Sequence, residues 1–344
     1  MRILKNAGKS CLSYERGTEA SGNTSGSRAR RGNVEGMKIL VVGAGATGGY
    51  FGARLVQAGR DVTFLVRPSR AEKLRSRGLR IIGPELNERI EPAIIEASGL
   101  TETYDLVLFA VKSTALEQAL DDLAPAVGPS TVIIPFLNGL RHLDALNDRF
   151  GPDQVLGGVV KIATDTSDDG DILYLGGIVP SLEIGEQDGA PSDRLLDITR
   201  ELTVEGFDII RGGDIMAAMW NKWVFIVSLT ATTTLMGGTV GDVAAVPGGA
   251  AIGAAIVAEA AAVAEAAGYP LGAGGIAAVT GMATQPGSPL TTSLYRDLNA
   301  GRPTETEPMV GDFVERARRL SVAAPVLDLA IARLRVYEYQ RTQL

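Results

Sequence analysis

Residues 37–52 read MKILVVGAGATGGYFG, and this stretch decides the fold of the chain. The apolar run at 39–42 is typical of a strand buried on both faces, as the strands of parallel sheets are. The strand leads directly into GAGATG at 43–48, which fits the pattern G-x-G-x-x-G, and a helical pattern follows over 49–58. A strand, a glycine-rich turn and a helix in this order predict a dinucleotide-binding unit.

The glycines of the turn have distinct physical roles in such a unit. Gly43 permits the tight turn, Gly45 lets the backbone approach a pyrophosphate, and Gly48 lets the helix pack closely on the strand. The phosphates would lie against the free N–H groups and the positive dipole end of the helix. The predicted contacts in the turn are Gly43, Ala44, Gly45, Ala46, Thr47 and Gly48. The alternative is a glycine-rich structural turn without a ligand.

The composition is that of a soluble globular protein, and 344 residues suggest two domains. A net charge of −7 gives no indication of a nucleic-acid or membrane surface. The only cysteine, Cys11, lies in a segment at 1–36 rich in Gly, Ser and Arg, so the rest of the chain has no thiol. We interpret 1–36 as a disordered extension, or as sequence upstream of a true start at Met37, and expect a cytosolic protein. Apolar runs at 223–236 and 250–267 are interpreted as packed helices rather than membrane spans.

The end of the second predicted strand, at 61–66, indicates which dinucleotide binds. An NAD site usually has an Asp or Glu there to hold the ribose 2′-hydroxyl. Here Arg67 and Arg70 follow the strand, and no acid precedes Glu72. Because guanidinium groups complement a 2′-phosphate, the sequence favours NADP. The alternative is that both arginines lie on the solvated start of a helix.

Two further predicted strands, at 105–111 and 130–137, end in the polar residues Lys112 and Asn138. Ligands bind at the carboxyl edge of an open parallel sheet, so we interpret both as ligand contacts. A solvated lysine and an ordinary Asn-Gly turn are the alternatives. His142, the only histidine, is expected to be partly exposed with a structural hydrogen bond, and a general acid is the alternative. No spacing of His, Asp and Glu suggests a metal site.

The chain changes character near Gly212, where helical patterns replace strand patterns. This predicts an α/β chain with a Rossmann-type dinucleotide-binding domain at 37–211 and an all-helical domain at 212–344. The expected helices are 214–236, 249–267, 274–283, 288–300, 305–320 and 325–341. Thr304 and Glu307 fit a capping box at the start of the fifth.

Lys222 lies between large apolar residues in the sequence MWNKWVF. Burial would lower the pKa of this lysine, which suits a proton donor that works near neutral pH. A lysine that reaches the surface of its helix is equally compatible with the pattern.

Together these motifs resemble the ketopantoate reductases (2-dehydropantoate 2-reductases) from Met37 to about Leu334. The matching segments are ILVVGAGATGG, AVKS at 110–113, LNG at 137–139, MWNKW at 219–223 and TSLYRDLNAGRPTETE at 292–307. The resemblance implies hydride transfer from NADPH to the ketone of a 2-oxo acid, first of all 2-dehydropantoate. The active site would lie in a cleft between a Rossmann-type domain and a helical domain.

The resemblance also implies roles for individual residues. Lys222 would be the general acid that protonates the developing alkoxide, and Glu305 would orient that lysine or hold the ligand. Ser293 would hydrogen-bond the substrate carboxylate, and Asn138 would contact both substrate and cofactor. The implied NADP contacts outside the glycine turn are Arg67, Lys112, Asn138 and Ala163.

Three positions depart from the family pattern, which has asparagines where this chain has Ile226, Thr230 and Val240. A lost hydrogen bond to substrate costs about 1–3 kcal/mol of specific binding. A reductase of a different, more apolar 2-oxo acid is therefore an alternative, and a non-catalytic NADP-binding sensor is another. The alanine-rich helix at 250–267 is compatible with a core helix or with a homodimer interface.

Overall fold

The computed structural model describes residues 36–343, so the prediction made for 1–36 lies almost wholly outside them. The predicted first strand is β1 (Ile39–Val42), the centre of a five-stranded parallel sheet with the order β5-β2-β1-β6-β7. The other strands of this sheet are β2 (Val62–Leu65), β5 (Ala93–Ile95), β6 (Leu106–Phe109) and β7 (Val132–Pro135). The parallel order confirms the predicted Rossmann-type fold.

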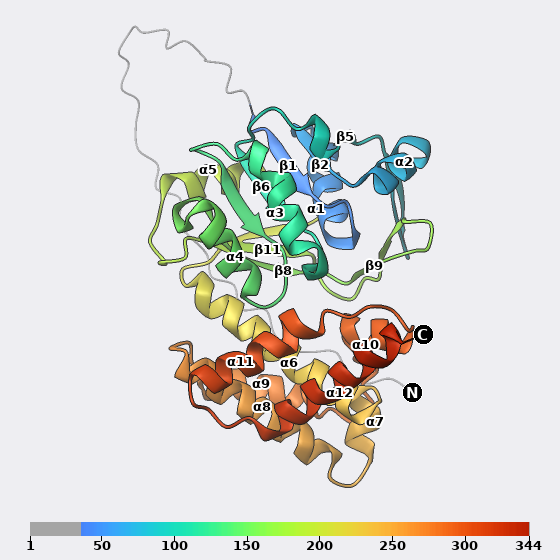
Figure 1. Ribbon diagram of the computed structural model, residues 1–344, viewed down its shortest axis with the longest axis vertical. Coiled ribbons are helices and arrows are strands. Elements are labelled where there is room, and N and C mark those ends of the chain that lie inside the picture. Colours follow the sequence, from blue (N-terminus) through green and yellow to red (C-terminus); the bar gives the residue numbers. More distant parts are fainter. Residues whose placement is uncertain (1–35, 344) are drawn as a thin grey trace, which may run out of the picture. The chain divides into compact units, whose positions relative to one another are not determined.

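Helices cover both faces of this sheet (Figure 1). Along β1 the side chains alternate: Ile39 and Val41 join one hydrophobic cluster, and Leu40 and Val42 join the other. The first cluster takes residues from α1 (Ala46–Gln57), α2 (Pro68–Arg77) and α5 (Asp193–Leu202). The second takes residues from α3 (Leu116–Leu123) and α4 (Arg141–Phe150). Because all four β1 residues are buried, the strand reads as a continuous apolar run.

Two smaller sheets complete this part of the chain. One has the order β4-β3-β10-β9, and its strands are β3 (Leu79–Gly83), β4 (Leu86–Ile90), β9 (Thr164–Thr166) and β10 (Ile172–Tyr174). The other has the order β12-β11-β8, with β8 (Gly157–Lys161), β11 (Ser181–Gly185) and β12 (Asp208–Arg211). The N–H of Leu156 donates to the carbonyl of Ile133 at 2.9 Å, so the segment entering β8 lies beside β7.

The described chain after residue 214 is helical, as predicted. Its helices are α6 (Ile215–Met236), α7 (Val240–Ala245), α8 (Gly249–Ala266), α9 (Gly272–Ala283), α10 (Ser293–Asn299), α11 (Asp312–Arg319) and α12 (Pro325–Thr342). A π-helical turn, η5 (Glu307–Gly311), leads into α11. The short 3-10 turns are η1 (Ala97–Gly99), η2 (Ser113–Ala115), η3 (Ala124–Ala126) and η4 (Pro152–Gln154).

Two details of the helical part differ from the sequence analysis. Helix α7 was not expected, although Thr239 and Asp242 form a complete capping box at its start. The capping box expected for Thr304 and Glu307 is wrong. The Thr304 hydroxyl donates to Glu338 at 2.6 Å, and Glu307 pairs with an arginine of α12.

By length and composition alone, α6 and α8 could each cross a membrane, which is weak evidence because core helices pass the same test. Within the described chain α6 is mostly buried, whereas 44% of the apolar stretch of α8 is buried. Glu259 of α8 accepts the N–H groups of Val326 and Leu327 at the start of α12. This agrees with the interpretation of both segments as packed helices.

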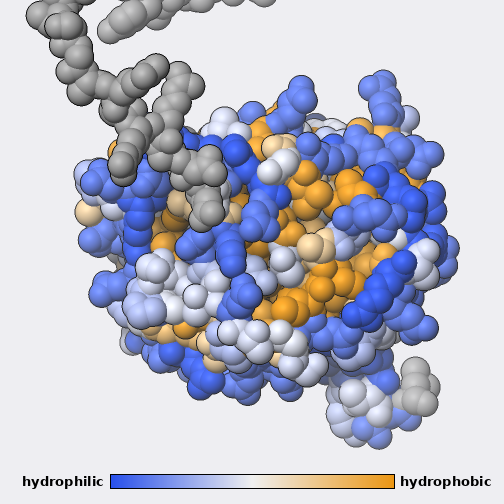
Figure 2. Space-filling model, turned by 90° about the horizontal axis from the view of Figure 1, so that it is seen from above, coloured by the Kyte–Doolittle hydropathy of each residue, from blue (hydrophilic) through white to orange (hydrophobic). Residues whose placement is uncertain are grey.

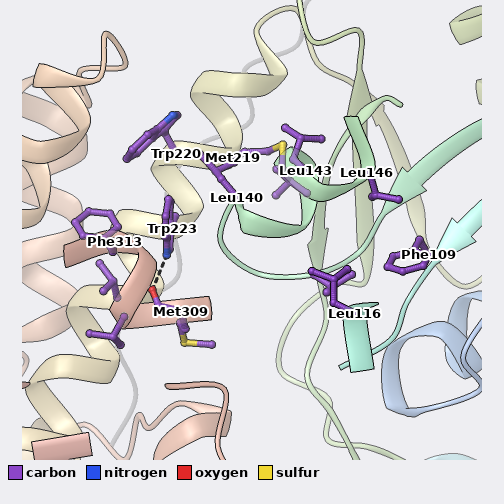
Figure 3. Packing of buried hydrophobic residues seen from close by; sticks show 14 of the residues in the cluster. Phe109, Leu116, Leu140, Leu143, Leu146, Met219, Trp220, Trp223, Met309 and Phe313 are labelled. Atoms are coloured by element: carbon purple, nitrogen blue, oxygen red, sulfur yellow. Dashed lines mark hydrogen bonds between the residues drawn. The ribbon is translucent and has the colours of Figure 1, made fainter. Parts of the chain in front are cut away.

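The second hydrophobic cluster continues from the sheet into the helical part. Figure 3 shows Leu140 and Leu143 near Met219 of α6, with Trp220 next to Met219 and Trp223 one turn further along. The indole N–H of Trp223 donates to the carbonyl of Met309 at 2.8 Å, a fully buried bond. A shared core therefore fixes α6 against the edge of the sheet where ligands were predicted.

Apolar residues also reach the surface. Figure 2 shows a broad hydrophobic area near the middle of the visible face, bordered by hydrophilic residues. On α12, the exposed side chains of Leu329, Val336 and Tyr339 lie at helical spacing on one side. Such surface is common in single chains, so the predicted homodimer stays a prediction.

Candidate active site

The glycine turn has the geometry expected for a phosphate-binding loop. Gly43 has φ +96°, and a Cβ on Gly48 would lie 2.4 Å from the Gly43 carbonyl oxygen and 2.6 Å from the Cβ of Ala110. Only glycine fits there, so the helix can approach the strand closely. A Cβ on Gly45 would meet nothing within 4 Å, and α1 begins directly after it. The loop therefore leaves open space in front of the N–H groups of the helix.

The two arginines after β2 have different surroundings. Arg67 is exposed at the start of α2. Arg70 is half-buried and donates to the carbonyl of Ala44 at 2.8 and 3.0 Å and to the carbonyl of Gly170 at 2.8 Å. Burial lowers the pKa of Arg70. Arg70 thus links the glycine turn to the loop at Gly170 through its hydrogen bonds. Arg67, which is exposed, is the arginine available to bind a 2′-phosphate.

Two residues after β6 bridge to the C-terminal part of the chain. The N–H and hydroxyl of Ser113 both donate to Oε1 of Glu305, at 2.7 and 2.5 Å. The neighbouring Lys112 is exposed, with its Nζ 3.7 Å from Oδ2 of Asp297. Within residues 36–343 no hydrogen bond or ion pair joins Glu305 to Lys222. The implied role of Glu305 in orienting that lysine therefore stays a prediction, and its partner is Ser113.

A small pocket lies between the turn after β7 and α6. The turn needs glycine, because Gly139 has φ +79° and a Cβ there would lie 2.9 Å from the carbonyl oxygen of Pro308. The residues that line the pocket are Leu137, Asn138, Gly139, Gly158, Val159, Met219, Lys222, Trp223 and Ile226. Asn138 and Lys222, each expected to contact the substrate, are thus brought together. The lining is otherwise apolar.

Lys222 is partly buried in this pocket. The pKa of Lys222 is lowered to about 8, mainly by burial and to a smaller extent by the positive charge of Lys161. Within residues 36–343 no carboxylate oxygen lies within ion-pair distance of its Nζ. The ammonium can therefore give up a proton near neutral pH far more readily than an ordinary lysine.

His142 is fully buried, so the expectation of a partly exposed histidine is wrong. Burial, followed by the charges of Lys222 and Arg316, lowers the pKa of His142 to about 3. The backbone of Asn138 acts in the opposite direction and raises the pKa, while the buried Nε2 has no hydrogen-bond partner within residues 36–343, so the expected structural hydrogen bond stays a prediction. A histidine that stays neutral at pH 7 cannot serve as a general acid there. It is a buried, neutral side chain near the Asn138 turn.

The remaining predicted residues differ in how exposed they are and in whether they line the pocket. Ser293 is exposed as the first residue of α10 and does not line the pocket, and Ala163 is half-buried between β8 and β9. Of the three positions that depart from the family pattern, only Ile226 lines the pocket. Thr230 is buried with its hydroxyl 3.5 Å from the sulfur of Met309, and Val240 is completely buried. The loss of polarity in the pocket therefore rests on one residue.

Several pocket residues were not named by the sequence analysis. Met219 and Trp223 lie inside the quoted segment MWNKW, so their helical spacing around Lys222 was the signal that could have found them. Gly158 and Val159 of β8 had no comparable signal. Across residues 36–343, no group of three or more His, Cys, Asp or Glu side chains could hold a metal ion.

Two family models match this chain. The model described as ketopantoate reductase PanE/ApbA matches residues 39–189, and the model of the C-terminal part of the same family matches 214–338. Among curated proteins, the chain is 35% identical over 309 residues to an uncharacterized oxidoreductase, YkpB, of Bacillus subtilis, which covers 89% of this chain and 100% of the relative. It is 29% identical to a 2-dehydropantoate 2-reductase of Mesorhizobium japonicum, with 89% and 99% covered.

Solved structures give the same picture. A 2-dehydropantoate 2-reductase from Methylococcus capsulatus matches with a TM-score of 0.76 and 28% identity, covering 88% of this chain and 97% of that one. A D-mandelate dehydrogenase solved with NADH and anilino(oxo)acetate matches with a TM-score of 0.80, covering 89% of this chain and 100% of that one. At 20% identity, the second likeness concerns the fold alone.

Proposed function

This chain belongs to the ketopantoate reductase family, and on that premise we propose that it reduces 2-dehydropantoate to pantoate with NADPH as the hydride donor. Family membership makes it an oxidoreductase that uses a nicotinamide dinucleotide and acts on a small 2-oxo acid. The choice of NADPH over NADH and of 2-dehydropantoate over other 2-oxo acids is the proposal.

The residues of the glycine turn fit a dinucleotide. Gly45 leaves open space before the N–H groups at the start of α1, which suits a pyrophosphate. The exposed guanidinium of Arg67 would hold the 2′-phosphate, and Lys112, Asn138 and Ala163 would complete the contacts. When bound, NADPH supplies the hydride.

The observation that carries the proposal is Lys222. In the transition state, negative charge develops on the ketone oxygen, and a cation beside it stabilises the transition state more than the ground state. Lys222 holds a proton at Nζ with a pKa of about 8, so it can stabilise this charge and then release the proton. Asn138, which lines the pocket, would orient the substrate. The contact implied for Ser293 would form outside this pocket.

The second candidate is a reductase of a more apolar 2-oxo acid. It is favoured by Ile226, which cannot hydrogen-bond a substrate hydroxyl from the pocket wall. A matched pair of substrates separates the two: 2-dehydropantoate and 3,3-dimethyl-2-oxobutanoate have the same carbon skeleton and differ by one hydroxyl. We expect the higher kcat/KM for 2-dehydropantoate. If kcat/KM were about tenfold higher for the hydroxyl-free acid, a difference of about 1.4 kcal/mol in activation free energy, the enzyme would be a reductase of the more apolar 2-oxo acid.

The assay measures the oxidation of NADPH, detected by the fall in its absorbance, with each member of a panel of 2-oxo acids. Lys222→Ala should reduce the rate by about 10²-fold or more, because it removes the proton donor. Lys38→Ala is the matched control, since Lys38 is an exposed lysine paired with Glu102 and lies outside the pocket. Tight NADPH binding without turnover of any 2-oxo acid would instead favour the sensor. The cytosolic location stays a prediction.

A further inference from the structure

Lys161 is a cation two residues beyond Val159, which lines the active-site pocket, and the proposed reaction does not yet use it. It is the last residue of β8, and its side chain is exposed. Within residues 36–343 no carboxylate lies within ion-pair distance of it. Gly158 and Val159 of the same strand line the pocket that holds Lys222.

The alternation of side chains along β8 fixes the direction of Lys161. Val159 belongs to the hydrophobic cluster that contains Met219 and Trp223, whereas Val160 belongs to the cluster on the other face of the sheet. A Cβ on Gly157 would lie 2.7 Å from the side chain of Ile215, at the start of α6. Residues 157 and 159 therefore face α6, and Lys161, two residues further on, faces the same side.

The position along the strand brings Lys161 towards Lys222. The N-terminal end of β8 packs against the first turn of α6, and Val159 shares the pocket wall with Lys222, two turns into the helix. Lys161 does not itself line the pocket, but it follows Val159 by two residues on the same face of β8, so its side chain starts just beyond the pocket wall. The positive charge of Lys161 lowers the pKa of Lys222, as expected for two cations that face one space.

The acidic groups on this face do not neutralise the pair. In the β8–β11 ladder Ser181 lies opposite Lys161 and Glu183 lies opposite Val159, so both are on the α6 side. The carboxylate of Glu183 points at the backbone of Gly212, because a Cβ there would lie 3.0 Å from its Oε1. His142, from α4, is neutral above about pH 3, so it adds no charge.

We propose that the ammonium of Lys161 binds the carboxylate of the 2-oxo acid just beyond the pocket wall, beside the proton donor Lys222. The inference rests on the proposed function, because it names the carboxylate subsite of the same reaction. Two cations without a carboxylate between them repel each other, and an anionic substrate relieves this repulsion. The pair thus selects 2-oxo acids over neutral ketones, while Lys222 remains available to the ketone oxygen.

The test compares Lys161→Gln, which removes the charge, with Lys161→Arg, which keeps it. In the glutamine variant we expect KM for the 2-oxo acid to rise about tenfold or more, as for loss of a charge-assisted hydrogen bond, with kcat changed less than about threefold. The arginine variant should retain most of the affinity. Lys73→Gln, at an exposed lysine on α2, is the matched control and should change neither value.

A second readout does not need turnover. Oxamate, an unreactive analogue of a 2-oxo acid, can be titrated against the NADPH complex by tryptophan fluorescence, since Trp220 and Trp223 are the only tryptophans and Trp223 lines the pocket. Its dissociation constant should rise about tenfold in Lys161→Gln, while that of NADPH stays unchanged. The loss of kcat/KM at alkaline pH, near pH 8 in the natural chain, should move to higher pH in Lys161→Gln and stay in place in Lys161→Arg.

Several results would overturn the proposal. Unchanged KM and oxamate affinity in Lys161→Gln would remove Lys161 from the carboxylate subsite, and equal losses in both variants would indicate a purely structural role. A natural chain whose NADPH complex binds no oxamate would have no such subsite. If that chain binds oxamate through Lys161 but reduces no 2-oxo acid, the proposed function fails and the carboxylate subsite stands.

Discussion

Replacing Lys222 by methionine should stabilise the fold while abolishing reduction. In the folded chain, burial and Lys161 lower the pKa of Lys222 from its ordinary 10.5 to about 8. A pKa difference of this size corresponds to about 3 kcal/mol by which the ammonium form disfavours folding. Because the side chain is only partly buried, solvent screening reduces the effect, and we expect about 2 kcal/mol. Methionine fills a similar volume without the charge.

The stabilisation should depend on pH in one direction. The folded pKa of Lys222 is depressed, so between about pH 8 and 10.5 the unfolded chain binds more protons than the folded chain. The natural chain therefore gains stability relative to the variant as the pH rises through this window. In urea unfolding, the variant should be more stable by about 2 kcal/mol at pH 7 and by less than about 1 kcal/mol at pH 10.

A matched substitution tests whether methionine itself stabilises the protein. Lys38 is exposed and 2.9 Å from Glu102, which raises the pKa of this lysine. Lys38→Met should therefore leave stability unchanged or lower it. If Lys222→Met were no more stable than the natural chain at pH 7, or equally stabilised at both pH values, the reasoning from burial would be refuted.

Three further substitutions test the cofactor site and its supports. Arg67→Ala should weaken NADPH binding about tenfold or more and leave NADH binding nearly unchanged in calorimetric titration, because only NADPH carries the 2′-phosphate; equal losses would contradict this. Ser113→Ala removes one of two hydrogen bonds to Glu305 and should lower the free energy of unfolding in urea by about 1–2 kcal/mol, so an unchanged midpoint would speak against the bond. Gly48→Ala would place a Cβ 2.4 Å from the carbonyl oxygen of Gly43. It should lower the free energy of unfolding by about 1–3 kcal/mol and weaken NADPH binding. A variant with unchanged stability and unchanged NADPH affinity would show that the loop accommodates the added methyl group.

The sequence predicted features whose causes lie close together in the chain. The apolar run of β1, the glycine turn and the start of α1 are consecutive, so strand, turn and helix could be assigned together. Helices α8 and α12 were predicted to within one residue at each end. Helix α7 was missed although its capping box spans only four residues, because at six residues it is too short for a hydrophobic period to show.

Features that depend on distant partners could not be predicted. Arg70 looked like a phosphate ligand, but its partner Gly170 lies 100 residues away and holds it behind the turn. Thr304 looked like a helix cap, but Glu338 of α12 competes for its hydroxyl. In both cases a tertiary contact replaced the local interpretation.

The candidate site divides in the same way. The pattern around Lys222 indicated an apolar setting, and the lysine does line an apolar pocket. Spacing along α6 could not show that Ile226 faces this pocket while Thr230 is packed against Met309. The partner of Glu305 is 192 residues away at the end of β6, and only folding brings the two together.

The link formed by Arg70 also bears on the entropy of cofactor binding. Its guanidinium is bonded at once to Ala44, inside the glycine turn, and to Gly170, on a separate loop. Ordering one backbone residue costs about 1–2 kcal/mol, so a turn of four or five residues that is ordered only on binding would lose several kcal/mol of affinity. Here folding has already ordered the turn. A dinucleotide that enters finds its phosphate ligands preorganised, and more of its contact energy is available as affinity.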